Sequence, residues 1–167
     1  MSLGASINLA AFEAIITNER SGDVIHISDD GSTNHVTKLC NRPRGMTKGI
    51  DNSQVLVACS DDNKVITYNR KTRAIEAEIT NVTGAMNLAF HKPTGQLLVT
   101  NEGSSRASVY ELESGRLIAK LPTGLEPDGI AITGDGKLIF VASENAGLVH
   151  VFDGATYQPL DVIRTNL

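Results

Sequence analysis

The 167-residue sequence contains no tryptophan, and aromatic residues of all kinds make up only 4% of it. Proteins that stack nucleic-acid bases or enclose quaternary ammonium groups depend on aromatic side chains. The formal net charge of −4 also provides no concentrated basic surface for phosphate groups. The composition therefore argues against nucleic acid as the main ligand.

Long apolar runs are absent as well. No uninterrupted apolar segment approaches the roughly 20 residues that a membrane-spanning helix needs. Residues Met1 to Ala11 lack a basic region, and Glu13 interrupts the apolar stretch that follows, so no signal peptide is predicted. With 41% hydrophobic and 20% charged residues, the composition is typical of a globular protein without a membrane span.

Residues with reactive or metal-binding chemistry are few. Two cysteines, Cys40 and Cys59, are too few for a disulfide scaffold, and their spacing leaves open whether they pair. The histidines show no metal-site spacing, and nucleophile-elbow, Walker and dinucleotide motifs are missing. Asp29 to Asn34 lacks the closing glutamate of an EF-hand, so it is interpreted as a polar hairpin turn. We therefore predict no catalytic residue, no metal and no cofactor.

An internal repeat is the strongest feature of the sequence. Thr17, Ala58, Thr100 and Ala142 occupy equivalent positions at spacings of 41, 42 and 42 residues, and the tenth residue after each is apolar or aromatic. The matching segments are AIITNERSGDVIHIS, VLVACSDDNKVITYN, LLVTNEGSSRASVYE and IFVASENAGLVHVFD. Repeats of about 42 residues indicate a chain built from four similar units.

Each unit contains four short runs rich in Val, Ile, Leu and aromatic residues, separated by Gly, Asp, Asn and Ser, as expected for strands and hairpins. Four strands in a unit of this length predict an all-β propeller with four four-stranded antiparallel blades. We place them at residues 7–40, 43–80, 85–121 and 127–164 of one propeller unit, 1–167. An evenly spaced β-sandwich is the alternative, but it has no reason to repeat in fixed register.

Four blades leave the closure of the ring open. The chain could form a tight four-bladed ring, half of an eight-bladed ring closed by a second copy, or a segment of a longer propeller. A row curved for a larger ring would expose an apolar blade face at each end, which monomers avoid. We therefore expect a homo-oligomer.

Three motifs of the last unit resemble the YVTN-type β-propeller repeat: Pro127 to Ala131, Gly134 to Lys137, and Phe140 to Ala142. The chain is also similar to propellers associated with PQQ-dependent alcohol catabolism and to surface-layer-type propellers. This resemblance implies a propeller fold and a periplasmic or extracellular location, but no single activity. Asp51 to Ser53 and Lys92 to Gly95 depart from the family's turn motif, although they remain good turn residues.

A candidate site follows from the topology of a propeller, in which the linkers between blades and the turns between second and third strands share one face. We expect a ligand to bind there, at the mouth of the channel, because loops on a rigid scaffold often carry binding residues. The candidates are Arg42, Arg44, Glu126 and Asp128 in the linkers, and Glu19, Asp61, Glu102 and Glu144 in the turns.

These residues allow different roles. Arg42 and Arg44 could hold a carboxylate or phosphate of a small anionic ligand, or pair with the linker and turn acids. The turn acids could serve only as turn residues and as charges that discourage edge pairing. We predict a non-catalytic scaffold that binds a ligand or protein partner. The alternatives are a lactonase-like hydrolase acting on a sugar lactone, or a segment of a quinoprotein-type oxidoreductase.

Overall fold

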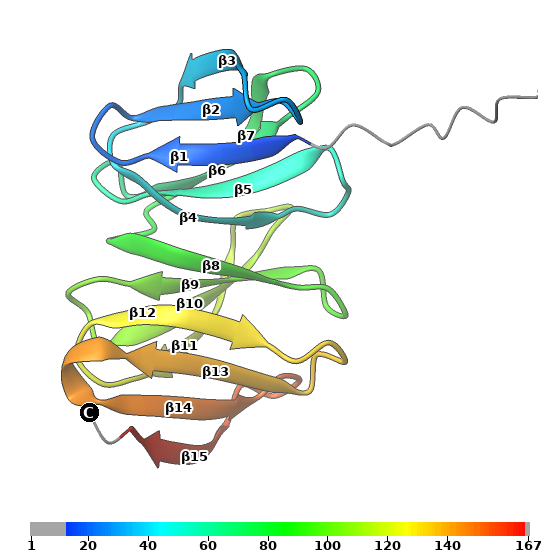
Figure 1. Ribbon diagram of the computed structural model, residues 1–167. Coiled ribbons are helices and arrows are strands. Elements are labelled where there is room, and N and C mark those ends of the chain that lie inside the picture. The colour runs from blue at the N-terminus through cyan, green and yellow to red at the C-terminus, as the bar shows by residue number, and fades with distance from the viewer. Residues whose placement is uncertain (1–12, 166–167) are drawn as a thin grey trace, which may run out of the picture.

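The computed structural model describes residues 13–165, which form four antiparallel β-sheets (Figure 1). The first sheet contains β1 (Ala14–Asn18), β2 (Asp23–Ile27) and β3 (Thr33–Lys38). The second contains β4 (Pro43–Lys48), β5 (Gln54–Cys59), β6 (Lys64–Asn69) and β7 (Ala74–Thr80). The third contains β8 (Ala85–His91), β9 (Gln96–Asn101), β10 (Arg106–Glu111) and β11 (Leu117–Pro122). The fourth contains β12 (Pro127–Ile132), β13 (Leu138–Ser143), β14 (Leu148–Asp153) and β15 (Pro159–Arg164).

Within each sheet every strand pairs with its neighbour in sequence, so each sheet is a meander of hairpins. The only helical segment between residues 13 and 165 is the 3-10 turn η1 (Glu144–Ala146), which is too short to span a membrane. The predicted all-β, four-bladed architecture is therefore confirmed. The innermost strand expected for the first blade falls on residues 7–12, outside the described part of the chain.

Burial follows the position of each strand in its blade. β5 and β9 are buried on both faces because they lie between two neighbouring sheets, whereas the outer strands β7 and β15 are largely exposed. β8 packs beside both β4 and β12, which places the innermost strands around a common axis. Three apolar clusters form the core, one at each junction between consecutive sheets.

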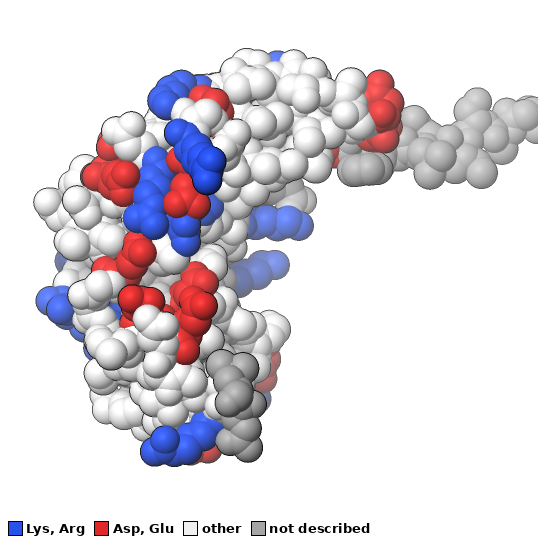
Figure 2. Space-filling model, turned by 60° about the vertical axis from the view of Figure 1, so that its left-hand side comes forward, with Lys and Arg blue, Asp and Glu red and all other residues white. Residues whose placement is uncertain are grey.

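The four blades form a curved row that does not close on itself. The first sheet lies at one end of the row and the fourth at the other (Figure 1), and the row is hooked when viewed from the side (Figure 2). Of the closures considered above, the tight four-bladed ring is not the arrangement observed.

A disulfide joins the first two blades. Cys40 follows β3, and Cys59 ends β5 in the next sheet; both are buried. The bond answers the question that the sequence left open, because the register of the two blades, rather than the spacing in the chain, brings the cysteines together.

Candidate functional site

All eight predicted site residues lie on the linkers and turns at one end of the blades. Glu19, Asp61, Glu102 and Glu144 follow the second strand of the four repeats. Arg42 and Glu126 immediately precede β4 and β12, and Arg44 and Asp128 are the second residues of those strands. Figure 2 shows this face, with a basic patch beside several acidic groups.

Arg42 connects three blades through its guanidinium group. Its Nε donates to Glu19 Oε1 at 2.9 Å, and its Nη1 donates to Glu102 Oε2 at 3.1 Å and lies 3.6 Å from Asp61 Oδ1. Arg44 Nη1 donates to the other oxygen of Glu19 at 2.7 Å. The structure therefore brings five of the eight predicted residues into one ion-pair network, the pairing with turn acids that the sequence left as an alternative.

The network biases the protonation of its members. Hydrogen bonds from Arg42 and then Arg44 lower the pKa of Glu19, because they favour its charged form. The hydrogen bond to Glu19, followed by the charge of Glu102, raises the pKa of Arg42. Both groups consequently remain charged at neutral pH and hold each other in place at the channel mouth.

The backbone before each inner strand has a conformation that the sequence analysis missed. Arg42, Gly84 and Glu126 occupy equivalent positions and have φ values of 52°, 58° and 51°. Their carbonyl oxygens each accept a hydrogen bond from a backbone amide in the turn after the second strand of the blade. The donors are the amides of Ser60, Glu102 and Glu144, at 3.1, 2.7 and 3.1 Å respectively. Only glycine adopts this left-handed conformation without cost, so Gly84 was the one residue in the sequence that could have indicated it. The bond fixes each linker to the turn that follows the second strand of the same blade.

Two threonines also position the site, and sequence reasoning missed them. Thr17 Oγ1 donates to the carbonyl of Arg44 at 3.0 Å, and Thr100 Oγ1 donates to the carbonyl of Asp128 at 3.0 Å. Each contact links one blade to the inner strand of the next. The recurrence of threonine at the anchor of the repeat was the only sequence signal for this role.

The remaining predicted residues form an acidic half of the same face. Glu126 Oε2 accepts a hydrogen bond from Asn145 Nδ2 at 2.6 Å. Within residues 13–165, Glu126, Asp128 and Glu144 form no ion pair with a lysine or arginine. Arg42 and Arg44 are therefore compensated by acids, whereas these three acids are not compensated by a basic residue; Arg20, which lines a cleft on the same face, also forms no ion pair within the described residues.

Two open clefts flank the network. One of about 330 Å³ is lined by Thr17, Glu19, Pro43, Arg44, Gly45, Met86, Asn87 and Asp128. The other, of about 470 Å³, is lined by Glu19, Arg20, Asn41, Arg42 and Asp61. Glu19 belongs to both, so one carboxylate with two arginine partners separates the two clefts.

The histidines serve other parts of the fold. His150 Nε2 accepts a hydrogen bond from the amide of Gly124 at 2.8 Å, and burial lowers the pKa of His150. His91 contacts the carbonyl of Gly136 at 2.8 Å, and His26 lies in the core between the first two sheets. Among residues 13–165, no group of three or more His, Cys, Asp or Glu side chains is arranged to hold a metal ion.

Solved structures share this architecture. A functionally unknown protein from Desulfotomaculum acetoxidans is 14% identical over 91% of this chain and 52% of its own, with a TM-score of 0.77. A "putative 6-phosphogluconolactonase" from Bacteroides uniformis is 17% identical over 92% of this chain and 52% of its own, with a TM-score of 0.75. Hydrazine synthase from Kuenenia stuttgartiensis is 23% identical over 74% of this chain and 36% of its own, with a TM-score of 0.68.

No family model matches the sequence, and no curated protein matches it. The chain spans about half the length, or less, of the solved structures that it resembles. At these identities the likeness concerns the fold alone. The chain has a β-propeller-like fold made of four blades.

Proposed function

We propose that the protein is a non-catalytic propeller scaffold that binds a basic segment of a partner protein at its channel-mouth face. The observation that carries this proposal is the uneven compensation of charge on that face. Arg42 and Arg44 are paired with acids, whereas Glu126, Asp128 and Glu144, in the third and fourth repeats, have no basic partner between residues 13 and 165. A cationic side chain gains an interaction there without breaking an existing one.

An anionic ligand, which the sequence also suggested, fits this face less well. It would have to displace Glu19 from Arg42 and Arg44, where the hydrogen bonds are 2.9 and 2.7 Å long. Losing a charge-assisted hydrogen bond offsets much of what a new carboxylate or phosphate would contribute. The cleft beside Arg44 also contains Asp128, which repels an anion.

The name of the Bacteroides uniformis neighbour favours a second candidate, a lactonase-like hydrolase. Ring opening of a lactone needs a group that activates water or polarises the carbonyl, and Arg44 is the residue on this face best suited to the latter role. A segment of a quinoprotein-type oxidoreductase remains a further alternative from the sequence resemblance.

We also propose that the chain belongs to the YVTN-type repeat family and that the protein lies in the periplasm or outside the cell. The motifs around Pro127 and Phe140 support the family, and the Cys40–Cys59 disulfide supports the location. Disulfides form and persist mainly in oxidising compartments.

Binding of fluorescein-labelled tetralysine, followed by fluorescence anisotropy at low and moderate salt, tests the proposal. We expect Glu126→Gln and Glu144→Gln each to weaken binding by roughly fivefold, because each removes one exposed charge contact. Glu113→Gln, in the exposed β10–β11 turn, is the matched control and should leave the affinity unchanged. Equal binding by the site variants and the wild type would contradict the proposal.

An activity assay separates the two candidate functions. Incubation with a panel of sugar lactones, with and without calcium, should give no turnover above the uncatalysed rate. Turnover that Arg44→Ala abolishes would instead establish the hydrolase and overturn the non-catalytic scaffold.

A further inference from the structure

The two ends of the blade row expose apolar positions whose equivalents are buried at inner junctions of the row. At the start of the row, Ile16 on β1 is 45% exposed, whereas its equivalents Val57, Val99 and Val141 are fully buried. Ile16 pairs across the sheet with Ile25, which pairs with Val36, a residue that is 51% exposed. Residues paired directly across neighbouring strands point to the same side of the sheet, so these three side chains form one apolar surface. We call it the start face.

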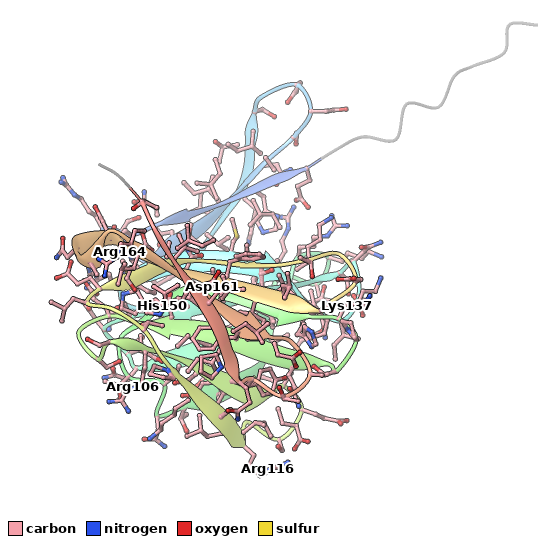
Figure 3. The ribbon with its side chains drawn as sticks, turned by 90° about the horizontal axis from the view of Figure 1, so that it is seen from below. Arg106, Arg116, Lys137, His150, Asp161 and Arg164 are labelled. Carbon is pink, nitrogen blue, oxygen red and sulfur yellow. A yellow bond between two sulfur atoms is a disulfide. The ribbon has the colours of Figure 1, made fainter. Side chains whose placement is uncertain are left out.

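The opposite end of the row carries a second apolar surface. Ile163 on β15 is 46% exposed, whereas Ile79 and Leu121, its equivalents in the second and third repeats, are 6% and 0% exposed; in the first repeat the polar Thr37 occupies this position. Ile163 pairs with Val149, which lies on the same side of the sheet as the half-buried Phe140. We call this surface the end face. Figure 3 looks along the row from this end, with β15 in front.

The interior of the molecule shows what these two faces bind. At the second junction Ile79 packs in one cluster with Val99, and at the third junction Leu121 packs in one cluster with Val141. Each contact joins the equivalent of Ile163 on one blade to the equivalent of Ile16 on the next. An end face and a start face are therefore the two halves of an interface that the chain forms internally.

We infer that two copies of this chain join head to tail, the end face of each on the start face of the other, and close a ring of eight blades. The contact is heterologous, and heterologous contacts give closed rings when the rotation per copy fits. The matched part of this chain covers 52% of two propeller-like neighbours, so two copies supply about the length of one such chain. The inference is independent of the ligand proposed above.

The first test is the mass of the 167-residue chain in solution, measured by size-exclusion chromatography with light scattering. A closed pair has a mass of about 35.6 kDa, twice the 17.8 kDa of one chain. A monomer at micromolar concentration would overturn the inference and leave further blades of a longer polypeptide as the cover for both faces. A mass that keeps increasing with concentration would also overturn it, because it indicates an open filament.

The second test uses charges on the two faces. Ile163→Lys and Ile16→Glu should each reduce the mass to that of a monomer, and both positions are exposed enough for the single chain to keep its fold. Ile50→Lys, in the β4–β5 turn where the side chain is 67% exposed, is the control and should leave the mass unchanged. Circular dichroism and thermal unfolding confirm that each variant is folded.

Mixing the two monomeric variants decides the geometry. In a head-to-tail pair, one interface then contains only unchanged residues and the other opposes a lysine to a glutamate. We expect the mixture to recover the mass of a pair. Failure of the mixture to associate, or full association of either variant alone, would overturn the head-to-tail arrangement.

Discussion

The first and third junctions between blades use the same backbone arrangement but different chemistry. At the first junction, His26 and Tyr68 occupy the positions that Val109 and Phe152 occupy at the third. His26 Nε2 lies 2.8 Å from the hydroxyl of Tyr68, whereas Val109 and Phe152 pack in one apolar cluster. The Cys40–Cys59 bond is also found at the first junction.

The difference shows that this pair of core positions accepts either a hydrogen-bonded pair or two apolar side chains. A tyrosine buried at this position needs a partner for its hydroxyl group, and the facing blade supplies one as His26. A phenylalanine at the same position needs none, and a valine faces it. The His26–Tyr68 contact and the Cys40–Cys59 bond fix the three described strands of the first sheet to the second sheet.

The largest effect on stability is expected at the third junction, between the third and fourth sheets. Leu98 is fully buried between the third and fourth sheets, so Leu98→Ala removes apolar contacts and leaves a cavity. We expect the free energy of unfolding to fall by about 4 kcal/mol, measured by urea denaturation. Because this junction contains no disulfide, the loss should be the same with and without dithiothreitol. A loss that depends on reductant would show that the two junctions unfold together.

The disulfide at the first junction should contribute slightly less to the free energy of unfolding than the Leu98 side chain does. The disulfide closes a segment with a sequence separation of 19, for which the loss of chain entropy predicts a stabilisation of about 3 kcal/mol. We expect Cys40→Ala combined with Cys59→Ala to lower the free energy of unfolding by this amount. Dithiothreitol should destabilise the wild type similarly and leave the double variant unchanged. An unchanged wild type in reductant would contradict this contribution.

Most of the fold could be predicted because blades are local structures. Strands, turns and the repeat depend on residues close together in sequence, and even the altered turn at Asp51 works, since Asp51 Oδ1 accepts the amide of Ser53 at 2.6 Å. Ring closure could not be predicted, because it depends on the angle between sheets packed over their whole faces. No single residue encodes that angle.

The candidate face was predictable as a set of loops but not as a network. Topology placed Arg42 and Glu102 on the same face although they are 60 residues apart. Which acids Arg42 contacts depends on side-chain lengths and on the left-handed backbone at Arg42, which the sequence shows only through the equivalent Gly84. The partner of His26 was not predicted either, because Tyr68 was noted only as an aromatic residue at a recurring position of the repeat.

The smallest effect concerns the charge that supports the first junction. Glu13 Oε1 accepts a hydrogen bond of 2.6 Å from His26 Nδ1, and its other oxygen lies 3.4 Å from Arg70 Nη1. Burial acts to raise the pKa of Glu13, but the hydrogen bonds and charges of His26 and Arg70 outweigh it and lower the pKa below its usual 4.5. We expect Glu13→Gln to cost about 1 kcal/mol at pH 7, because a charge-assisted hydrogen bond becomes a neutral one.

The pH dependence distinguishes this contribution from simple packing. A carboxyl group whose pKa is lower in the folded state stabilises the protein fully above its unfolded pKa, and the stabilisation is lost as the pH falls through the folded value. The difference in unfolding free energy between wild type and Glu13→Gln should therefore be constant above pH 5 and shrink below pH 4.5. Glu113→Gln, in an exposed turn, serves as the control and should show no such change. A difference that persists unchanged at low pH would mean that the shape of the side chain, rather than its charge, holds His26 in place.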